Sequence, residues 1–394
     1  MFDVKLLDQR RFSEEEFSNV ATALKTGQLS SYFKNPRGGP WIQAFEQELA
    51  KYHGVPYAVA CSNGTSALHM ALEAVLTEHL GVDYRSEKPV VTTTPYSFIA
   101  TASSILMAGA EPYFADIDPF SYTIPDCHST GYGVPRKSKI ILPVNLLGHP
   151  ANFDRIKESG TWDYIIEDNA QGLGALYKGR LCGALADIST CSFQYTKTIS
   201  TMGEGGAILT SNHSLYERCI QLRSHGSQYV DSPYLTYNYR MTDPQAAFGV
   251  AQLRKLGQFL TIQRQNALYI LNHLPRGLHR PKISGDVEHS FFLIPVIFDE
   301  EEAGMTREQF LQRCTDLGVN QNWPGASVSA GYLKPLYRKP LLQRYRPGYG
   351  CPGVEAVMKK SVWLDIHRWR TLDEVKQELE AMEKILERCS RLEG

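Results

Sequence analysis

The sequence predicts an α/β fold in which helices cover a mostly parallel sheet. Over the first two thirds of the chain, short β-branched or apolar runs alternate with segments of helical periodicity, which is typical of such sheets. The seven candidate strands are Tyr57–Ala60, Val90–Thr94, Pro112–Asp116, Ile140–Leu146, Tyr164–Glu167, Ile188–Phe193 and Ala207–Thr210. Ligands of parallel sheets bind at the carboxyl ends of the strands, so we expect the chemistry there.

Length and composition narrow the classes of protein further. The 394 residues are enough for two or three structural units and at least one large core. Lys plus Arg (41) nearly balance Asp plus Glu (42), so the net charge of −1 creates no strong field for nucleic acid or an anionic membrane. No apolar run approaches the ~18 residues of a spanning helix, and no signal peptide is recognisable. We expect a cytoplasmic protein that binds neither nucleic acid nor membrane.

The eight cysteines are dispersed along the chain, and no two of them form a C-x-x-C pair. This distribution indicates neither a zinc cluster nor a dense disulfide framework. We expect reduced thiols and no metal site.

Two amphipathic helices are predicted before the first strand. Ser13 and Glu16 have capping-box spacing, and the apolar residues after them share one helical face. These apolar residues are Phe17, Val20 and Leu24. The second helix begins at Pro40, and its apolar face consists of Trp41, Phe45, Leu49 and Tyr52. The loop between them, residues 30–40, is either a wall of a binding site or a plain surface loop.

After about residue 255 the pattern changes to that of a smaller α+β domain. Phe291–Phe298 is predicted as a strand and two capped helices follow it. The capping pairs are Thr306 with Gln309 and Thr371 with Glu374, and the apolar stripe of the last helix is Val375, Leu379, Met382 and Leu386. We expect a large domain over residues 1–255 and a small C-terminal domain over 256–394, on which the N-terminal helices could pack.

The first stretch with chemical interest joins the first strand to a helix through small polar residues. Gly64 lets backbone N–H groups approach a ligand, and Thr65 and Ser66 add hydroxyls at a helix N-terminus, where an anion is favoured. These features together predict a phosphate site. The alternative is ordinary N-capping by Asn63 or Thr65 without a ligand.

A second stretch places Glu167 and Asp168 at the end of a hydrophobic strand. A carboxylate there is costly unless it has a partner. Asp168 could hold a metal, a sugar hydroxyl or a protonated ring nitrogen, and the alternative is a cap for the turn around Gln171.

The third stretch holds a single lysine, Lys197, between two apolar strands and before a glycine-rich turn. No acidic residue lies within six positions of it. Partial burial of an amine lowers its pKa and favours imine chemistry. A solvent-facing lysine is the alternative.

Taken together, these stretches resemble the DegT/DnrJ/EryC1/StrS family of sugar aminotransferases, which are pyridoxal-phosphate enzymes of fold type I. The resemblance covers nearly the whole chain, and it depends on several motifs in order instead of on any one of them. The matching segments are Ser62–Leu68, Pro95–Thr101 with Gly109–Asp116, Glu167–Gln171, Ser192–Lys197, Gly203–Gly206, and Asn238–Met241 leading to Gln245–Ala247.

The resemblance implies a role for each matched residue around the cofactor ring. Lys197 would form the internal aldimine with pyridoxal 5'-phosphate, and Asp168 would pair with the pyridinium nitrogen and keep it protonated. Phe98 matches the position that stacks on the ring. Gln171 matches the position near the phenolic oxygen.

The resemblance also implies a phosphate site shared between subunits. Gly64, Thr65 and Ser192 match phosphate contacts of the same subunit. Asn238 matches a residue that reaches the phosphate from the other subunit, so a homodimer with shared active sites is expected. Arg240 matches a position that helps to bind the carboxylate of the amino donor.

The implied reaction is ping-pong transamination, with pyridoxamine phosphate as the intermediate form of the cofactor. Glutamate or glutamine would donate the amino group, and a keto sugar on a nucleotide carrier or a keto cyclitol would accept it. Two alternatives are a pyridoxamine-dependent sugar dehydratase, against which Lys197 speaks because histidine stands there in those enzymes, and a regulatory relative without turnover. A dehydrogenase is set aside because G-x-G-x-x-G does not follow the first strand.

Overall fold

A seven-stranded sheet with the order β1-β9-β8-β5-β4-β2-β3 forms the centre of the molecule. The structure, a computed structural model, describes residues 12–32, 35–125, 138–159, 162–226, 234–319, 328–348, 350–366 and 370–390. The strands are β1 (Tyr57–Cys61), β2 (Val90–Thr93), β3 (Glu111–Phe114), β4 (Ile140–Leu142), β5 (Tyr164–Asp168), β8 (Ile188–Ser192) and β9 (Gly206–Thr210). Every segment predicted as a strand of the large domain lies in this sheet, and the α/β fold class is confirmed.

The strand directions determine where functional side chains can gather. β2 pairs in parallel with β3 and β4, β4 with β5, and β5 with β8. Only β9 is reversed, because it runs antiparallel to both β1 and β8. The carboxyl ends of β1, β5 and β8 therefore lie at one edge of the sheet, and the connection from β8 to β9 turns at that edge.

Two predicted strands extend beyond the observed ones by three residues or more, and a backbone conformation explains each difference. The segment Ile140–Leu146 forms a strand only as far as Leu142, since residues 146–148 form a 3₁₀ turn in which Leu147 has φ of 59°. Phe291 has φ of 56°, so the extended strand β12 (Ile294–Phe298) begins three residues later. A positive φ of this size does not occur in a regular strand.

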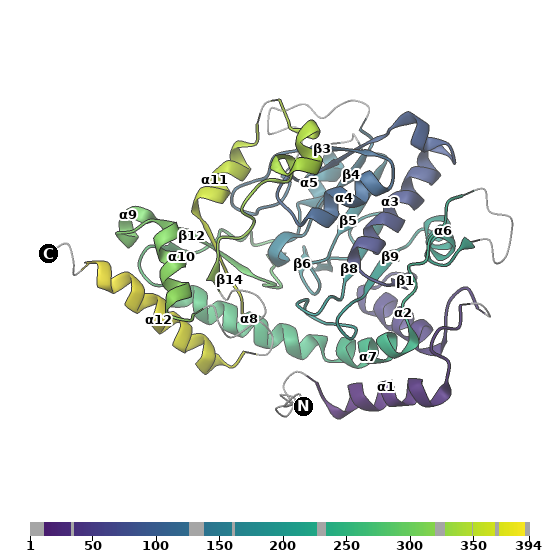
Figure 1. The fold of residues 1–394 in the computed structure, drawn as a ribbon, viewed down its shortest axis with the longest axis horizontal. Coiled ribbons are helices and arrows are strands. Elements are labelled where there is room, and N and C mark those ends of the chain that lie inside the picture. Colours follow the sequence, from purple (N-terminus) through teal and green to yellow (C-terminus); the bar gives the residue numbers. More distant parts are fainter. Residues whose placement is uncertain are drawn as a thin grey trace.

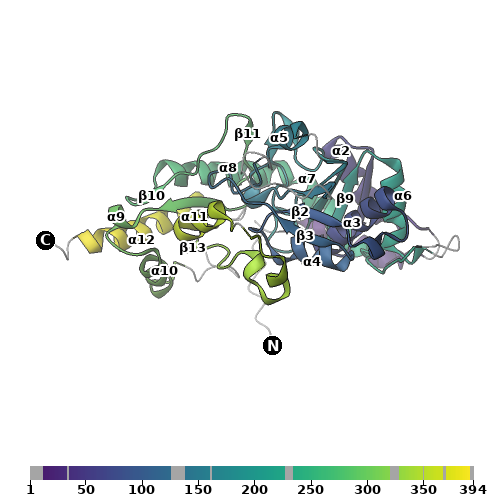
Figure 2. The ribbon, with the colours of Figure 1, turned by 90° about the horizontal axis from the view of Figure 1, so that it is seen from above.

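Helices cover both faces of the sheet (Figure 1). In Figure 2, α2 and α7 lie on one side of the sheet and α3 and α4 on the other. The helices are α1 (Glu14–Thr26), α2 (Pro40–His53), α3 (Gly64–Leu80), α4 (Ile99–Met107), α5 (Phe153–Glu158), α6 (His213–Arg223), α7 (Asp243–Arg254), α8 (Leu256–Asn272), α9 (Glu300–Ala303), α10 (Arg307–Asp316), α11 (Pro352–Lys360) and α12 (Leu372–Ser390). Residues 66–76 of α3 are buried on every side. This helix is the rigid inner element of the large unit.

The helix α1 has the predicted capping box, but the face it buries is not the predicted one. Phe17 and Leu24 are 45% and 55% exposed, whereas Glu16 is fully buried. The carboxylate of Glu16 accepts hydrogen bonds from Lys255 and Gln252. Helices α1 and α2 both pack on α7, within the large unit.

A second, smaller sheet lies beside the large one along the long axis of the molecule (Figures 1 and 2). It has the order β10-β12-β14-β13, and its strands are β10 (Leu278–His279), β12 (Ile294–Phe298), β13 (Val328–Ser329) and β14 (Ser361–Leu364). The predicted stripe of the last helix is buried against it: Val375, Leu379, Met382 and Leu386. A small third sheet joins β6 (Leu176–Tyr177), β7 (Arg180–Leu181) and β11 (Val287–Glu288).

The two units are not separated at one point of the sequence. Leu256 and Leu260, at the start of α8, pack into the core below the large sheet, and Ile270 at its end packs into the core of the small sheet. Leu336 and Val354, from the C-terminal part, lie in the core of the large unit. The chain thus crosses between the units several times, which ties them closely together.

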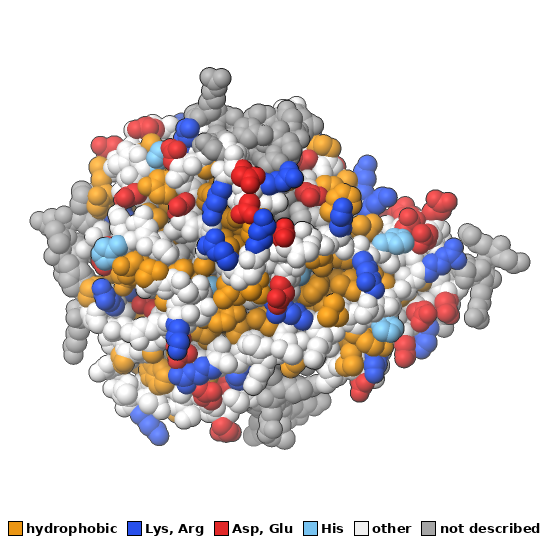
Figure 3. Space-filling view, turned by 180° about the vertical axis from the view of Figure 1, so that it is seen from behind, with side chains coloured by type: hydrophobic (Ala, Val, Ile, Leu, Met, Phe, Trp, Pro, Cys, Tyr) orange, Lys and Arg blue, Asp and Glu red, His pale blue; other side chains and the backbone are white. Residues whose placement is uncertain are grey.

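The surface of the described residues carries charges of both signs. Positive and negative side chains are interspersed over the face in Figure 3, with hydrophobic side chains in a band across its middle. Among the described residues, no helix combines the length and apolar character that crossing a bilayer requires. Six cysteines are free and buried, namely Cys61, Cys182, Cys191, Cys219, Cys314 and Cys351, whereas Cys127 and the side chain of Cys389 lie outside the described residues.

Candidate active site

A cavity of about 760 Å³ opens where the carboxyl ends of β1, β5 and β8 meet. Seven of the nine residues singled out in the sequence line it: Gly64, Thr65, Phe98, Asp168, Gln171, Ser192 and Lys197. They come from four separate segments of the chain, which the topology of the sheet brings together. The edge of the sheet where chemistry was expected is the edge that holds this cavity.

The N-terminus of α3 forms one end of the cavity. Asn63 caps this helix, and its side chain accepts a hydrogen bond of 2.8 Å from the backbone N–H of Ser66. A Cβ atom on Gly64 would lie 2.8 Å from Cβ of Ser192, so the two segments approach as closely as only glycine permits. Both predicted features of this segment are therefore present: Asn63 caps the helix, and Gly64 and Thr65 line the cavity. The positive end of the helix dipole faces the cavity.

Asp168 stands at the last position of β5 and is 2% exposed. Its carboxylate accepts hydrogen bonds from Oγ1 of Thr101 (2.9 Å) and the backbone N–H of Ala170 (3.2 Å). Burial raises the pKa of Asp168, while these two hydrogen bonds and the ammonium group of Lys197 act in the opposite direction. A buried carboxylate with so few donors favours a cationic partner in the cavity.

The neighbouring acid, Glu167, has a different role. Side chains alternate along a strand, so Glu167 points away from the cavity. Its carboxylate accepts hydrogen bonds from Ser189 Oγ (2.6 Å), Asn145 Nδ2 (2.7 Å) and Gly183 N (2.8 Å). These hydrogen bonds satisfy the carboxylate of Glu167 and connect β5 to its neighbours. Of the two acids, Asp168 is the one that lines the cavity.

Lys197 lies in the connection between β8 and β9 and is partly accessible from the cavity. Its Nζ atom is 4.5 Å from the centre of the Phe292 ring. Burial lowers the pKa of Lys197 to about 8, and the carboxylate of Asp168 limits the fall. An amine with this pKa is unprotonated in part at neutral pH, which a nucleophile requires.

Two further residues singled out in the sequence also line the cavity. Phe98 is 58% exposed, and it presents its ring at the start of α4. Gln171 is held at both ends of its amide: Oε1 accepts from the backbone N–H of Leu147 (2.8 Å), and Nε2 donates to the hydroxyl of Tyr332 (3.2 Å).

Asn238 and Arg240 do not line this cavity. Nε of Arg240 donates a hydrogen bond of 2.7 Å to Oδ1 of Asn238, and the side chain of Asn238 is exposed. The structure of one chain thus separates these two residues from the other seven.

Some lining residues were not singled out in the sequence. The hydrogen-bond donor Thr101 lies inside a quoted motif, and its position four residues after Ser97, one turn of helix, was the available signal. Phe292, Tyr332 and Trp363 come from the C-terminal part of the chain, where isolated aromatic residues carry no motif.

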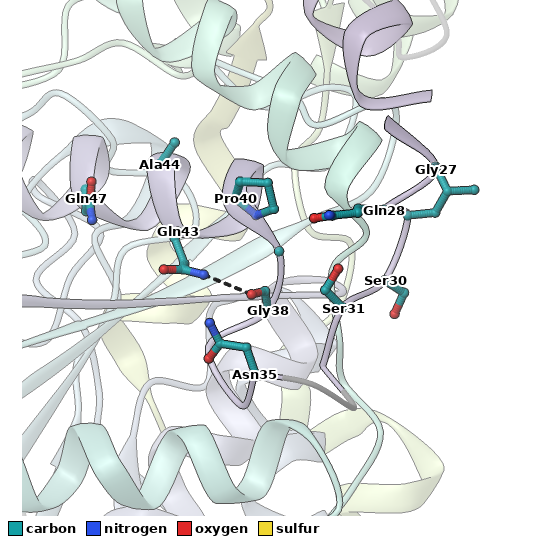
Figure 4. Close-up of a pocket in the computed structure, with 12 residues that line it drawn as sticks. Gly27, Gln28, Ser30, Ser31, Asn35, Gly38, Pro40, Gln43, Ala44 and Gln47 are labelled. Carbon is teal, nitrogen blue, oxygen red and sulfur yellow. Dashed lines mark hydrogen bonds between the residues drawn. The ribbon is translucent and has the colours of Figure 1, made fainter. Parts of the chain in front are cut away.

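The loop predicted as either a binding wall or a plain surface segment borders a second cavity, of about 870 Å³ (Figure 4). None of the residues that line it is charged, and the polar side chains among them include Gln28, Ser31, Asn35, Gln43 and Gln47. The side chain of Gln43 donates a hydrogen bond of 3.0 Å to the backbone oxygen of Gly38, which Figure 4 marks. None of these residues lines the cavity of Lys197.

Comparison with known proteins gives consistent similarities. The chain is 34% identical to GDP-perosamine synthase of Caulobacter vibrioides over 289 residues, which are 71% of this chain and 75% of that protein. It is 30% identical to UDP-4-amino-4,6-dideoxy-N-acetyl-beta-L-altrosamine transaminase of Campylobacter jejuni over 366 residues, 90% of this chain and 92% of that one. The solved structure of an aminotransferase from Psychrobacter cryohalolentis superposes with a TM-score of 0.83 at 27% identity, covering 96% of this chain and 98% of that one.

The model of one protein family spans almost all of the sequence. It matches residues 11–383, and this range includes each of the nine residues singled out above. The fold, the lysine and aspartate in one cavity and this match agree: the chain belongs to the DegT/DnrJ/EryC1/StrS aminotransferase family, whose members are in general pyridoxal-phosphate-dependent transaminases.

Proposed function

We propose that this chain transfers an amino group from glutamate or glutamine to a keto sugar, carried on a nucleotide, or to a keto cyclitol. The observation that carries the proposal is the meeting of three groups in one cavity: the lysine with a lowered pKa, the buried aspartate, and the N-terminus of α3. The named relatives act on nucleotide-linked sugars, which supports a nucleotide sugar as the acceptor.

The residues present fit pyridoxal phosphate. Gly64 and Thr65, at the N-terminus of α3, line the cavity, so a phosphate there would meet their backbone N–H groups, and the hydroxyls of Thr65 and Ser192 add donors. Phe98 offers an exposed ring for stacking. When bound, the cofactor supplies an electron sink for the electron pair of the Cα–H bond that breaks in the amino donor.

Asp168 would serve the ring nitrogen of the cofactor. Its carboxylate is held by Thr101 and Ala170 at the end of a central strand, so its position is fixed before any ligand enters. A protonated nitrogen supplies the cationic partner that a buried carboxylate needs, and the carboxylate in turn keeps that proton in place.

Lys197 would hold the aldehyde carbon of the cofactor until the amine of the donor displaces it. The freed Nζ atom then carries the proton removed from Cα of the donor, because an amine with a pKa of about 8 both accepts and returns a proton near neutral pH. In the second half of the reaction Nζ would move the same proton in the opposite direction, while the amino group replaces the carbonyl oxygen of the acceptor and that oxygen leaves as water.

A homodimer completes the proposed site. Asn238 and Arg240 are on the surface of one chain and outside its own cavity, so they would act in the cavity of the partner subunit. There Asn238 would contact the phosphate and Arg240 the carboxylate of the donor. The buried free thiols suit a reducing compartment, which supports a cytoplasmic location.

Reduction and peptide mapping test the proposal directly. The purified protein is mixed with pyridoxal phosphate, treated with borohydride and digested, and the modified peptide is identified by mass. The proposal expects the label on Lys197, a visible absorbance that glutamate or glutamine bleaches, and no labelling of Lys197→Ala. Binding of the cofactor without amino exchange with any donor would instead identify a regulatory protein.

A further inference from the structure

Asn238 lies between two tyrosines that point to the opposite side of their segment. The rings of Tyr237 and Tyr239 are stacked, with centroids 5.2 Å apart and an angle of 15° between their planes. Asn238 forms an isolated antiparallel bridge with Ser224, and side chains alternate along such a segment. The two tyrosines therefore face α3, and Asn238 faces outward, where Arg240 binds its side-chain oxygen.

The two tyrosine hydroxyls are anchored in a buried polar cluster on α3. Glu73, which is 2% exposed, accepts a hydrogen bond of 2.8 Å from Tyr237. One turn earlier on the same helix, Nδ1 of His69 lies 2.9 Å from the hydroxyl of Tyr239, and its Nε2 lies 3.3 Å from the carboxylate of Glu73.

Glu73 stays charged in this apolar helix because other donors also reach it. Tyr84 donates a hydrogen bond of 2.6 Å, and the guanidinium group of Arg85 forms an ion pair with the same carboxylate. These hydrogen bonds lower the pKa of Glu73 although burial acts against them. A buried charge is costly, and removing one of its partners is costlier still, so the cluster holds its members in defined positions.

The backbone of the same segment is fastened next to the N-terminus of α3. The N–H of Ser62 donates a hydrogen bond of 2.8 Å to the carbonyl oxygen of Tyr239, one residue before Asn63, which caps α3. The helix α3 thus carries the phosphate end of its own cavity at Gly64. About one and a half to two and a half turns further along, it carries His69 and Glu73, which anchor the segment that presents Asn238 to the outside.

We infer that His69 and Glu73 are positioning residues, which act through Tyr237 and Tyr239 to hold Asn238 in place for the phosphate of the cofactor in a second copy of this chain. The inference rests on the proposed function, in which Asn238 reaches that phosphate. It makes α3 the element that couples the two phosphate sites of the dimer.

The test compares the apo-protein's affinity for pyridoxal phosphate with its affinity for pyridoxal, which lacks the phosphate. Tyr237→Phe removes the hydroxyl that binds Glu73 and keeps the ring. We expect it to weaken binding of pyridoxal phosphate about fivefold, the scale of one ordinary hydrogen bond, and to leave pyridoxal binding unchanged. Tyr239→Phe should act in the same direction and serves as the second variant if the first does not fold.

Tyr84→Phe is the matched control, because it removes a hydroxyl from the same carboxylate but lies outside the segment of Asn238. It should leave the ratio of the two affinities as in the wild type. Asn238→Ala should lower this ratio, and adding Tyr237→Phe to Asn238→Ala should lower it no further, since Tyr237 acts only through Asn238.

Each outcome decides one of the two claims. An unchanged ratio in Tyr237→Phe and Tyr239→Phe, or a further loss when Tyr237→Phe is added to Asn238→Ala, overturns the inference while the proposed function stands. A wild-type protein that does not bind pyridoxal phosphate overturns the proposed function, and the inference falls with it.

Discussion

Nε2 of Gln171 and the hydroxyl of Tyr332 are 3.2 Å apart, and their hydrogen bond joins the large sheet to the smaller unit inside the active-site cavity. The other end of the same amide is fixed by Leu147, so the orientation of Gln171 is settled by two partners from distant parts of the chain. The smaller unit therefore helps to fix the orientation of the Gln171 amide before a ligand binds in the cavity.

Tyr332→Phe should therefore disturb the site without disturbing the fold. Loss of the hydroxyl leaves one amide hydrogen of Gln171 without its partner, at a cost of about 1 kcal/mol. We expect roughly a fivefold fall in kcat, with a shift in the pH dependence of the visible absorbance of the bound cofactor, and a Tm close to that of the wild type. Tyr337→Phe is the control, because the Tyr337 hydroxyl binds Glu355 outside the cavity and should leave both properties unchanged.

The burial of Lys197 should cost stability in a pH-dependent way. With a folded pKa of about 8 and an unfolded value of 10.5, the unfolded state binds more protons between these pH values, so stability rises as pH increases through that window. Lys197→Met should stabilise the apo-protein below pH 8, by up to about 3 kcal/mol, and the gain should vanish toward pH 10.5. Urea denaturation at pH 7 and pH 10 measures it, and an equal gain at both pH values would contradict the lowered pKa.

Asp168→Asn should separate binding of the cofactor from its use. The amide keeps the shape of the carboxylate, so binding should persist, but it cannot stabilise a cation, and kcat should fall about a hundredfold or more. Since Asp168 raises the pKa of Lys197, the variant should also shift the pH midpoint of amine reactivity below 8. Kinetics of cofactor attachment across pH 6 to 10 report this midpoint, and a midpoint that moves upward would refute the contact.

Two glycines allow a matched test of the phosphate end. Gly64→Ala places a methyl group 2.8 Å from Cβ of Ser192 and should cost about 1–3 kcal/mol and weaken binding of the cofactor. Gly257 lies in α8, and a Cβ there meets nothing within 4 Å, so Gly257→Ala should be stabilising by up to about 1 kcal/mol. Thermal denaturation and cofactor titration of both variants give the comparison. Equal effects at the two positions would argue against the close approach at Gly64.

Most of the fold could be predicted from the sequence because capping boxes and strand segments depend on residues that are close together in the chain. The capping pairs Ser13 with Glu16 and Thr306 with Gln309 both form, and the seven strand segments all enter the large sheet. The exposed face of α1 was not predictable in this way. Periodicity identifies Phe17 and Leu24 as a face but cannot show that Glu16 finds partners about 240 residues away, in Lys255 and Gln252.

The site divides along the same line. Asp168 ends a strand and Lys197 follows one, and a strand end is a place where function is expected from the sequence. Phe292 precedes β12 and Tyr332 follows β13, both strands of the smaller sheet, and both residues line the cavity. The residues next to them in the sequence form no motif that would predict this position. Their part depends on how the two units pack, which is set by many long-range contacts at once.

The reversed strand β9 has a consequence for how this protein can change over evolution. Strands β8 and β9 are consecutive in the sheet and pair with each other, so the segment that holds Lys197 is the loop of a hairpin. A shift of this segment would break the pairing of these two strands. The part of the cavity wall that contains Tyr332 is formed by a loop that follows the short strand β13. Substitutions that change the preferred acceptor should therefore accumulate around Tyr332. Directed evolution toward new acceptors should find most of its tolerated substitutions in the same part of the wall.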